Sequence, residues 1–189
     1  MFGFIGFLFT VFLILAVLLV LFAIAGYNRL VALRQRCKNG WAQIENQLKR
    51  RHDLIPNLVE TVKGYMRHER EVLENVVKAR QQAIDVRGVQ EAAQAENMLT
   101  QALRSLFALV ENYPELRASE NVRALQEELA STENKIAFAR QFYNDQVMEY
   151  NTAIQQFPWS FFAAMFHFEP EEYFEVEDAA VREVPKVQF

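Results

Sequence analysis

The side chains best suited to acid–base chemistry stand in two adjacent pairs. His52 precedes Asp53, and His68 precedes Glu69. Successive residues on a helix point about 100° apart, so neither pair can form a side-chain hydrogen bond within one helix. We therefore interpret both pairs as solvated or capping polar groups. The basic run from Arg50 to His52 could hold a phosphate, but a solvated helix end is the commoner reason for such a run.

The sequence also lacks the motifs of metal and nucleophilic sites. Di-iron bundles use Glu-x-x-His motifs, whereas the residues three positions before the three histidines are Lys49, Tyr65 and Ala164. There is no His-Glu-x-x-His, no Cys-x-x-Cys, no glycine-rich phosphate loop and no serine in a nucleophile elbow. Cys37 is the single cysteine, and it falls on an apolar helical stripe, as a small core residue would. We therefore expect no catalytic residue, no cofactor and no metal site, and a protein that is not an enzyme.

An uncharged segment opens the chain. The first charged residue is Arg29, and the run from Phe2 to Ile24 is apolar apart from one threonine and two glycines. A helix of about 23 residues spans about 35 Å, which is enough to cross a hydrocarbon core of about 30 Å. We predict a transmembrane anchor over residues 1–26. A cleaved signal peptide is the alternative, because Ala23-Ile24-Ala25 resembles a cleavage site, but no basic residue precedes the unusually long apolar run.

The charges that follow the anchor predict its orientation. Four basic residues come before the first acidic residue, Glu45: Arg29, Arg34, Arg36 and Lys38. Basic flanks stay on the cytoplasmic side of a membrane. We therefore expect a single-pass protein with its N-terminus outside and its soluble domain in the cytoplasm.

Behind the anchor, apolar residues recur every three or four positions, which indicates amphipathic helices. We predict four helices, over residues 27–51, 53–87, 91–111 and 120–157. The second would begin with Asp53 as its N-cap and Pro56 in its first turn, and would end at Gly88. Helices joined by short turns pack antiparallel, so the fold class is all-α: one transmembrane helix, then an antiparallel bundle over residues 27–157. A helix that continues through Pro56 with a kink, giving a three-helix bundle with one long arm, is the alternative.

The C-terminal tail, residues 158–189, is first aromatic and then acidic. Its candidate interaction residues are Trp159, Phe161, Phe162, Phe166, Phe168, Tyr173 and Phe174. Such a cluster packs on its own bundle, lies in the membrane interface or docks a neighbouring subunit. The acidic residues that begin at Glu169 count against the membrane, because anionic lipid would repel them.

Several segments of the chain resemble the LemA family. They are the run QLKRRHDLIPNLVETVKGY at residues 47–65 with His68 and Glu69, ENYPEL at 111–116, LQEEL at 125–129 with TEN at 132–134, YND at 143–145, and the pairs Tyr150-Asn151 and Phe157-Pro158. The resemblance extends from about Tyr27 to Phe174. It implies a protein of the bacterial inner membrane with an antiparallel helical domain, but no settled activity. A relative that takes part in magnetosome membrane formation favours assembly at a membrane, by analogy.

The expected partners follow from charge and from the anchor. A net charge of −4 argues against nucleic acid, which requires a basic face. We expect the lipid bilayer as one partner, together with self-association or another membrane protein. The leading hypothesis is a membrane-anchored helical scaffold or assembly protein. The alternative is an adaptor or regulatory subunit of a membrane enzyme complex, such as a protease or an envelope-stress system.

Overall fold

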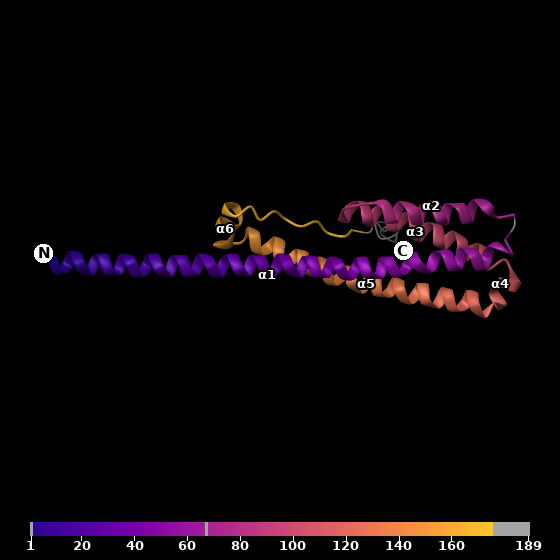
Figure 1. The fold of residues 1–189 in the computed structure, drawn as a ribbon, viewed down its shortest axis with the longest axis horizontal. Helices are drawn as coiled ribbons and strands as arrows, with labels where there is room; N and C mark the ends of the chain where they lie inside the picture. Colours follow the sequence, from indigo (N-terminus) through magenta and orange to yellow (C-terminus); the bar gives the residue numbers. More distant parts are fainter. Residues whose placement is uncertain (1, 67, 176–189) are drawn as a thin grey trace, which may run out of the picture. The chain divides into compact units, whose positions relative to one another are not determined.

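A computed structural model of the chain describes residues 2–66 and 68–175, and this part contains helices and no strand. The helices are α1 (Phe2–Lys63), α2 (Arg70–Asp85), α3 (Val89–Val110), α4 (Pro114–Ala118), α5 (Glu120–Gln155) and α6 (Trp159–Met165) (Figure 1). The predicted all-α fold with a long apolar N-terminal helix is confirmed. The N-terminal part of α1 is long and apolar enough to cross a membrane, with a mean hydropathy of 3.2 and none of that window buried.

The break predicted at Asp53–Pro56 is wrong, because α1 continues through Pro56 to Lys63. Proline has no backbone N–H for the carbonyl four residues earlier, which here belongs to His52. Arg80 of α2 takes the place of the missing donor, with its Nε 2.6 Å from the His52 carbonyl oxygen. The chain breaks instead at residues 64–69, so the predicted helix 53–87 is divided between α1 and α2.

The chain divides into two compact units. Unit 1 is Met1–Gly40 with Tyr143–Glu171, and unit 2 is Trp41–Phe142 with Glu172–Phe189. Both α1 and α5 therefore contribute to each unit. The predicted boundaries at residues 26 and 157 separate an anchor, a bundle and a tail, and they stay predictions.

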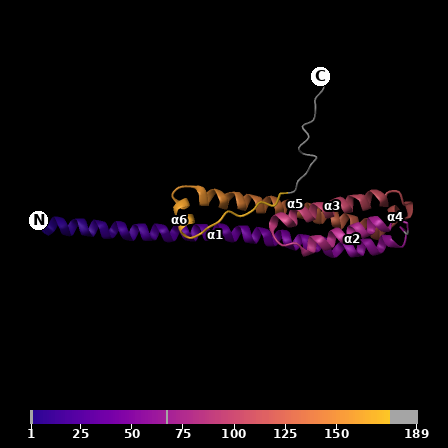
Figure 2. The same ribbon diagram turned by 90° about the horizontal axis from the view of Figure 1, so that it is seen from above.

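Unit 2 is an antiparallel bundle in which α2 and α3 lie beside the second part of α1, together with the first part of α5 (Figures 1 and 2). Its core is apolar and includes Ile55, Leu58, Val76, Leu99 and Leu106, all with no exposed surface. The turn between α2 and α3 contains Gly88, whose φ of 107° favours glycine. The glycine predicted to end this helix therefore lies in the turn, and α3 and α5 match the two later predicted helices closely.

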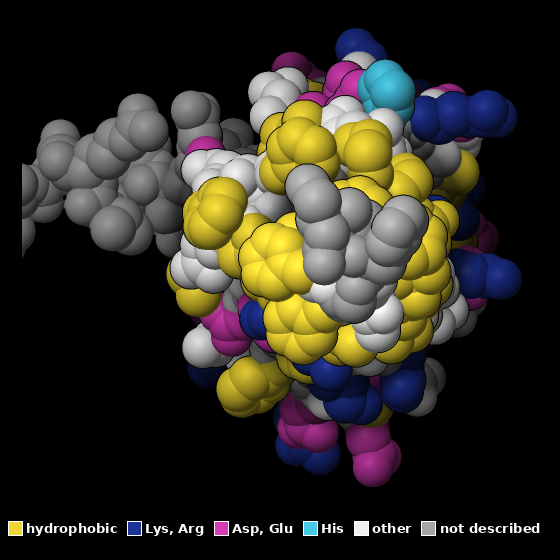
Figure 3. All heavy atoms as spheres, turned by 90° about the vertical axis from the view of Figure 1, so that its left-hand side faces the viewer, with side chains coloured by type: hydrophobic (Ala, Val, Ile, Leu, Met, Phe, Trp, Pro, Cys, Tyr) yellow, Lys and Arg dark blue, Asp and Glu magenta, His cyan; other side chains and the backbone are white. Residues whose placement is uncertain are grey.

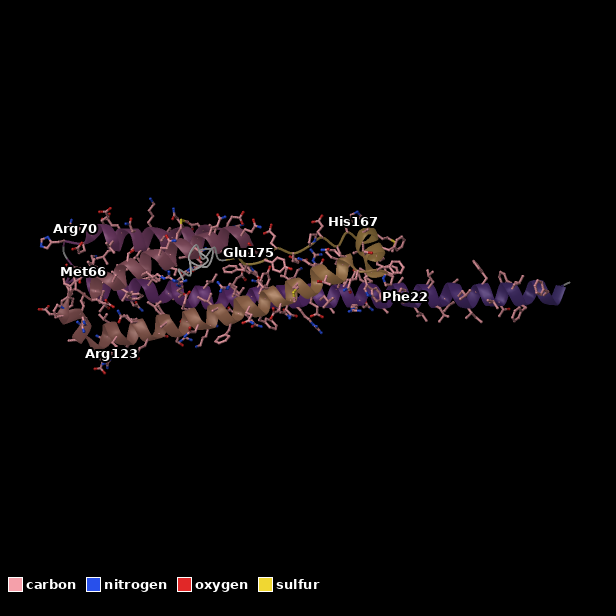
Figure 4. All side chains as sticks on the ribbon, turned by 180° about the vertical axis from the view of Figure 1, so that it is seen from behind. Phe22, Met66, Arg70, Arg123, His167 and Glu175 are labelled. Atoms are coloured by element: carbon pink, nitrogen blue, oxygen red, sulfur yellow. The ribbon has the colours of Figure 1, made fainter. Side chains whose placement is uncertain are left out.

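Unit 1 pairs the first part of α1 with the end of α5 and with α6. Its buried hydrophobic residues are Leu30, Leu33 and Cys37 from α1, Tyr143, Val147, Tyr150, Ala153 and Ile154 from α5, and Phe162 and Ala163 from α6. Gly40 allows the two long helices to approach closely, since a Cβ there would lie 3.2 Å from the Tyr143 Cα. Figure 4 labels Phe22 on α1 and His167 just after α6, both in this unit.

Candidate functional site

Aromatic residues of α6 and of the segment just after it form a cluster with two aromatic residues of α1, here called the aromatic collar. Its members are Phe22, Tyr27, Trp159, Phe162, Phe166 and Phe168. The ring of Trp159 stacks on Phe22 at 5.1 Å between centroids, and Phe162 meets Phe22 edge-on at 6.0 Å. Tyr27 contacts Phe166 at 5.0 Å and Phe168 at 5.7 Å. Offset and edge-on geometries of this kind are the favourable ones for aromatic rings.

A glycine and an arginine on α1 determine how Trp159 is seated. A Cβ on Gly26 would lie 2.5 Å from the Trp159 ring, so only glycine leaves room for the indole. The guanidinium carbon of Arg29 lies 5.5 Å from the centroid of the same ring, within the range of a cation–π interaction. Trp159 thus contacts three positions of α1, which span about two helical turns.

The segment after α6 is tied to unit 1 through its backbone. Asn151 is buried, and its Nδ2 donates to the Glu171 carbonyl while its Oδ1 accepts from the Glu171 N–H, both at 2.9 Å. The Tyr150 hydroxyl donates to the Glu169 carbonyl at 2.8 Å, and Arg34 Nε lies 3.2 Å from Glu171 Oε1. The backbone of this segment is therefore bound to α5, and the Glu171 carboxylate lies beside Arg34 of α1.

Burial changes the acidity of two groups in this unit. Burial, and then the Glu171 carboxylate, raise the pKa of the Cys37 thiol to about 11. Burial also raises the pKa of Tyr150 above its ordinary value of 10.0, with Arg34 acting in the opposite direction. Cys37 is only 2% exposed. A thiol that is both buried and protonated at neutral pH is a poor nucleophile, so the environment of Cys37 is that of a core residue.

Unit 2 contains a largely buried cluster of polar side chains around the Arg51–Glu96 ion pair, here called the ion cluster; its other members are His52 and Glu133. Arg51, His52 and Glu96 are 4%, 8% and 5% exposed. Arg51 Nη1 lies 3.2 Å from Glu96 Oε2 and 3.1 Å from Glu133 Oε2, and its Nη2 donates to Thr100 Oγ1 at 2.8 Å. His52 Nε2 lies 2.6 Å from Glu96 Oε1. One carboxylate therefore joins two basic side chains in the core.

The same unit carries an open apolar groove of about 930 Å³ between the end of α1 and α2. Apolar side chains form much of its lining, with basic residues among them. The lining residues are Val59, Lys63, Met66, Arg70, Leu73, Glu74, Val77, Lys78 and Gln81. Met66, in the break between the two helices, and Arg70, the first residue of α2, are labelled in Figure 4.

Within residues 2–66 and 68–175, no group of three or more His, Cys, Asp or Glu side chains is placed to hold a metal ion. The model of the LemA family matches residues 40–189. The chain belongs to the LemA family.

Among curated proteins, this LemA-family chain is similar to magnetosome protein MamQ of Magnetospirillum gryphiswaldense. The two are 23% identical over an aligned length of 179 residues, and the match covers 81% of this chain and 66% of MamQ. Magnetosome proteins MamQ 1 and MamQ 2 of Paramagnetospirillum magneticum match with the same identity and coverage. The chain thus spans slightly less than two thirds of the length of these relatives.

Segments that carry the family resemblance supply most of the ion cluster. Arg51 and His52 lie in the run 47–65, and Glu133 lies in the TEN motif. The interpretation of His52 as a solvated group is wrong, because the packing of α3 against α1 buries it. The interpretation as solvated groups is correct for Asp53 and His68, which are exposed. One signal was present in the sequence: Glu96 falls between Ala92 and Leu99 on the apolar stripe of α3, where a charge needs a buried partner.

The structure divides the seven predicted interaction residues between the two units. Five of them, from Trp159 to Phe168, lie in unit 1, whereas Tyr173 and Phe174 lie in unit 2. Phe162 and Phe174 are buried in the chain's own cores, at 8% and 1% exposed. Phe161 is 66% exposed and Phe166 44%. The role of these residues in interactions stays a prediction. The exposed ones among them have side-chain surface that a partner could contact.

Proposed function

We propose that this LemA-family protein is a membrane-anchored helical scaffold, without catalytic activity of its own, that self-associates or recruits partners at the bacterial inner membrane. In this proposal α1 crosses the membrane with its N-terminus outside, and the basic residues after the apolar run stay in the cytoplasm. The relatives' description as magnetosome proteins agrees with a role in assembly, by analogy.

The observation that carries the proposal is the apolar surface of unit 2. The groove along α1 and α2 contains Val77, which is 49% exposed, and α5 presents Phe138 and Phe142 at 74% and 43% exposed. Large apolar patches on a helical surface mark protein contacts, because leaving them in water is unfavourable. A helix that lays an apolar face in such a groove is a recurrent mode of recognition. These surfaces support helix-to-helix assembly.

Mass photometry of the full-length protein in native lipid discs tests the proposal. We expect particles larger than one copy, and a shift towards single copies when Val77→Glu and Phe138→Glu place charges on the apolar surfaces. The matched control is Gln82→Glu, which adds the same charge at an exposed position of α2 outside the groove lining. Single copies of the unmodified protein in discs and in the native membrane would contradict self-association.

The size of the groove favours a second candidate, an adaptor that holds one helix of a larger membrane enzyme complex. That function predicts single copies in discs, together with a defined one-to-one crosslink to a larger membrane protein. A photo-crosslinking residue at position 77 distinguishes the two functions, because the crosslinked product contains either a second copy or a different chain.

A further inference from the structure

A second stretch without charge lies far from the anchor in sequence. No Asp, Glu, Lys or Arg occurs between Glu149 and Glu169. The stretch contains the end of α5, α6 and the last collar residues. Its large apolar side chains are not all covered by the chain: the exposed ones are Phe157 at 88%, Phe161 at 66%, Met165 at 49% and Phe166 at 44%.

The collar places this stretch beside the end of the apolar part of α1. Trp159 stacks on Phe22, which lies inside the apolar run that ends at Ile24. Phe166 contacts Tyr27, two residues before the first charged residue, Arg29. A helix that contacts these residues lies at the level where α1 would pass from lipid to water. Figure 3 looks from the N-terminal end of α1 and shows hydrophobic side chains gathered on that face.

We propose that α6 and the turn before it make a second contact with the membrane, in which Phe157, Phe161 and Met165 enter the lipid surface beside the point where α1 leaves it. This inference rests on the proposed membrane anchor. Amphipathic helices that lie in the plane of a membrane bury their apolar face at the level of the headgroups and upper acyl chains in this way.

The charges of unit 1 favour lipid as the occupant of this surface. The Arg29 guanidinium lies over Trp159, and an arginine beside a tryptophan suits the headgroup region, where both are enriched. Glu171 is paired with Arg34, so part of the negative charge that would repel anionic lipid is neutralised. The acidic residues thus begin only after the uncharged stretch, and Glu171 among them is paired with Arg34 of α1.

Fluorescence quenching by spin-labelled lipids tests the inference on the full-length chain in vesicles of phosphatidylethanolamine and phosphatidylglycerol. Single cysteines carrying an environment-sensitive dye are placed by Phe161→Cys in α6, by Leu15→Cys in the anchor and by Asn39→Cys on the exposed side of α1 beyond it. Native Cys37 is 2% exposed, so the unmodified protein serves as the labelling blank. Phe157→Cys repeats the measurement at a second exposed position of the same surface.

We expect the dye at position 161 to emit at shorter wavelength in vesicles and to lose intensity most with lipids labelled near the headgroup. The dye at position 15 should lose intensity most with lipids labelled near the chain end, and the dye at position 39 should lose little. Quenching at 15 without quenching at 157 and 161 would overturn the α6 contact and leave the anchor standing. A blue shift at 161 without quenching would also overturn it, since protein would then cover the surface. No quenching at 15 would refute the anchor, and the inference with it.

Discussion

Removal of the Glu96 carboxylate should destabilise unit 2 severely. Glu96 is 5% exposed and is the shared partner of Arg51 and His52 in the ion cluster. Glu96→Ala leaves the Arg51 guanidinium in the core with Glu133 as its remaining ionic partner, and Glu133 has a side chain that is 49% exposed. Breaking a buried ion pair by removing one partner typically destabilises a protein by about 3–5 kcal/mol. We expect a loss of this size in the free energy of unfolding.

A surface ion pair in the same unit provides the control. Arg50 Nη2 lies 2.7 Å from Glu128 Oε1, a shorter distance than in the buried pair, but the two side chains are 49% and 43% exposed. Exposed pairs contribute about 0–1 kcal/mol because water screens them. Glu128→Ala should therefore cost far less than Glu96→Ala, although both remove one glutamate carboxylate from an arginine.

Urea denaturation of the full chain in detergent, followed by far-ultraviolet circular dichroism, measures both effects. A double variant tests the reasoning further. Arg51→Met with Glu96→Met should be less destabilising than Glu96→Met alone, because it also removes the buried Arg51 guanidinium, which otherwise keeps only the half-exposed Glu133 as an ionic partner. Equal losses for Glu96→Ala and Glu128→Ala would refute the argument from burial. So would a double variant that is less stable than the single one.

Four further predictions follow from individual residues. Gly26→Leu should displace Trp159 and shift the tryptophan emission to longer wavelength in lipid discs. Gly6→Leu is the control and should leave the emission unchanged, because a Cβ at Gly6 meets nothing within 4 Å. Equal spectra for the two variants would contradict the packing of Trp159 against Gly26. Cys37 should react slowly with iodoacetamide at about pH 8 until urea unfolds the chain. The pKa of Cys37 is raised from 9.0 to about 11, so the protonated thiol contributes to the stability of the fold. This contribution is fully present below pH 9.0 and is lost as the pH rises towards 11. Urea denaturation at a series of pH values measures the loss. Arg80→Ala should cost about 1–3 kcal/mol by leaving the His52 carbonyl without its donor. Adding Pro56→Ala should recover part of that loss by restoring a backbone N–H, and a double-mutant cycle in urea measures the recovery.

The sequence predicted the helical fold because its signals are local. The apolar run of α1 and the spacing of core residues along α3 and α5 can be recognised without knowing which helix each of them packs against. The aromatic collar was foreseen only in part, since the residue types were visible but their contacts were not. Phe162 and Phe161 are neighbours of the same type, yet one is buried and the other exposed. That difference depends on which face of α6 meets Phe22, and no local pattern in seven residues determines it.

The ion cluster could not be assembled from the sequence because its members lie far apart in the chain. Arg51 and Glu96 are 45 positions apart, and Glu133 lies on another helix. Adjacent charges at Arg50 and Arg51 look alike in the sequence, but Arg51 faces the core and Arg50 faces solvent. The charge of Glu96 within an apolar stripe was the available sign that one basic residue on another helix would be buried with it.

Pro56 shows why a correct local rule gave a wrong helix boundary. The rule counts two costs of proline inside a helix: a steric clash with the preceding turn and a carbonyl that loses its donor. In α1 the second cost is offset by Arg80, which is 28 positions from the carbonyl it satisfies. Ile55 and Leu58, on either side of the proline, are fully buried, so the core holds the helix through this turn. At Gly64 a Cβ would meet nothing within 4 Å, and glycine favours helix only weakly, so the helix ends there although Met66 in the following turn is fully buried.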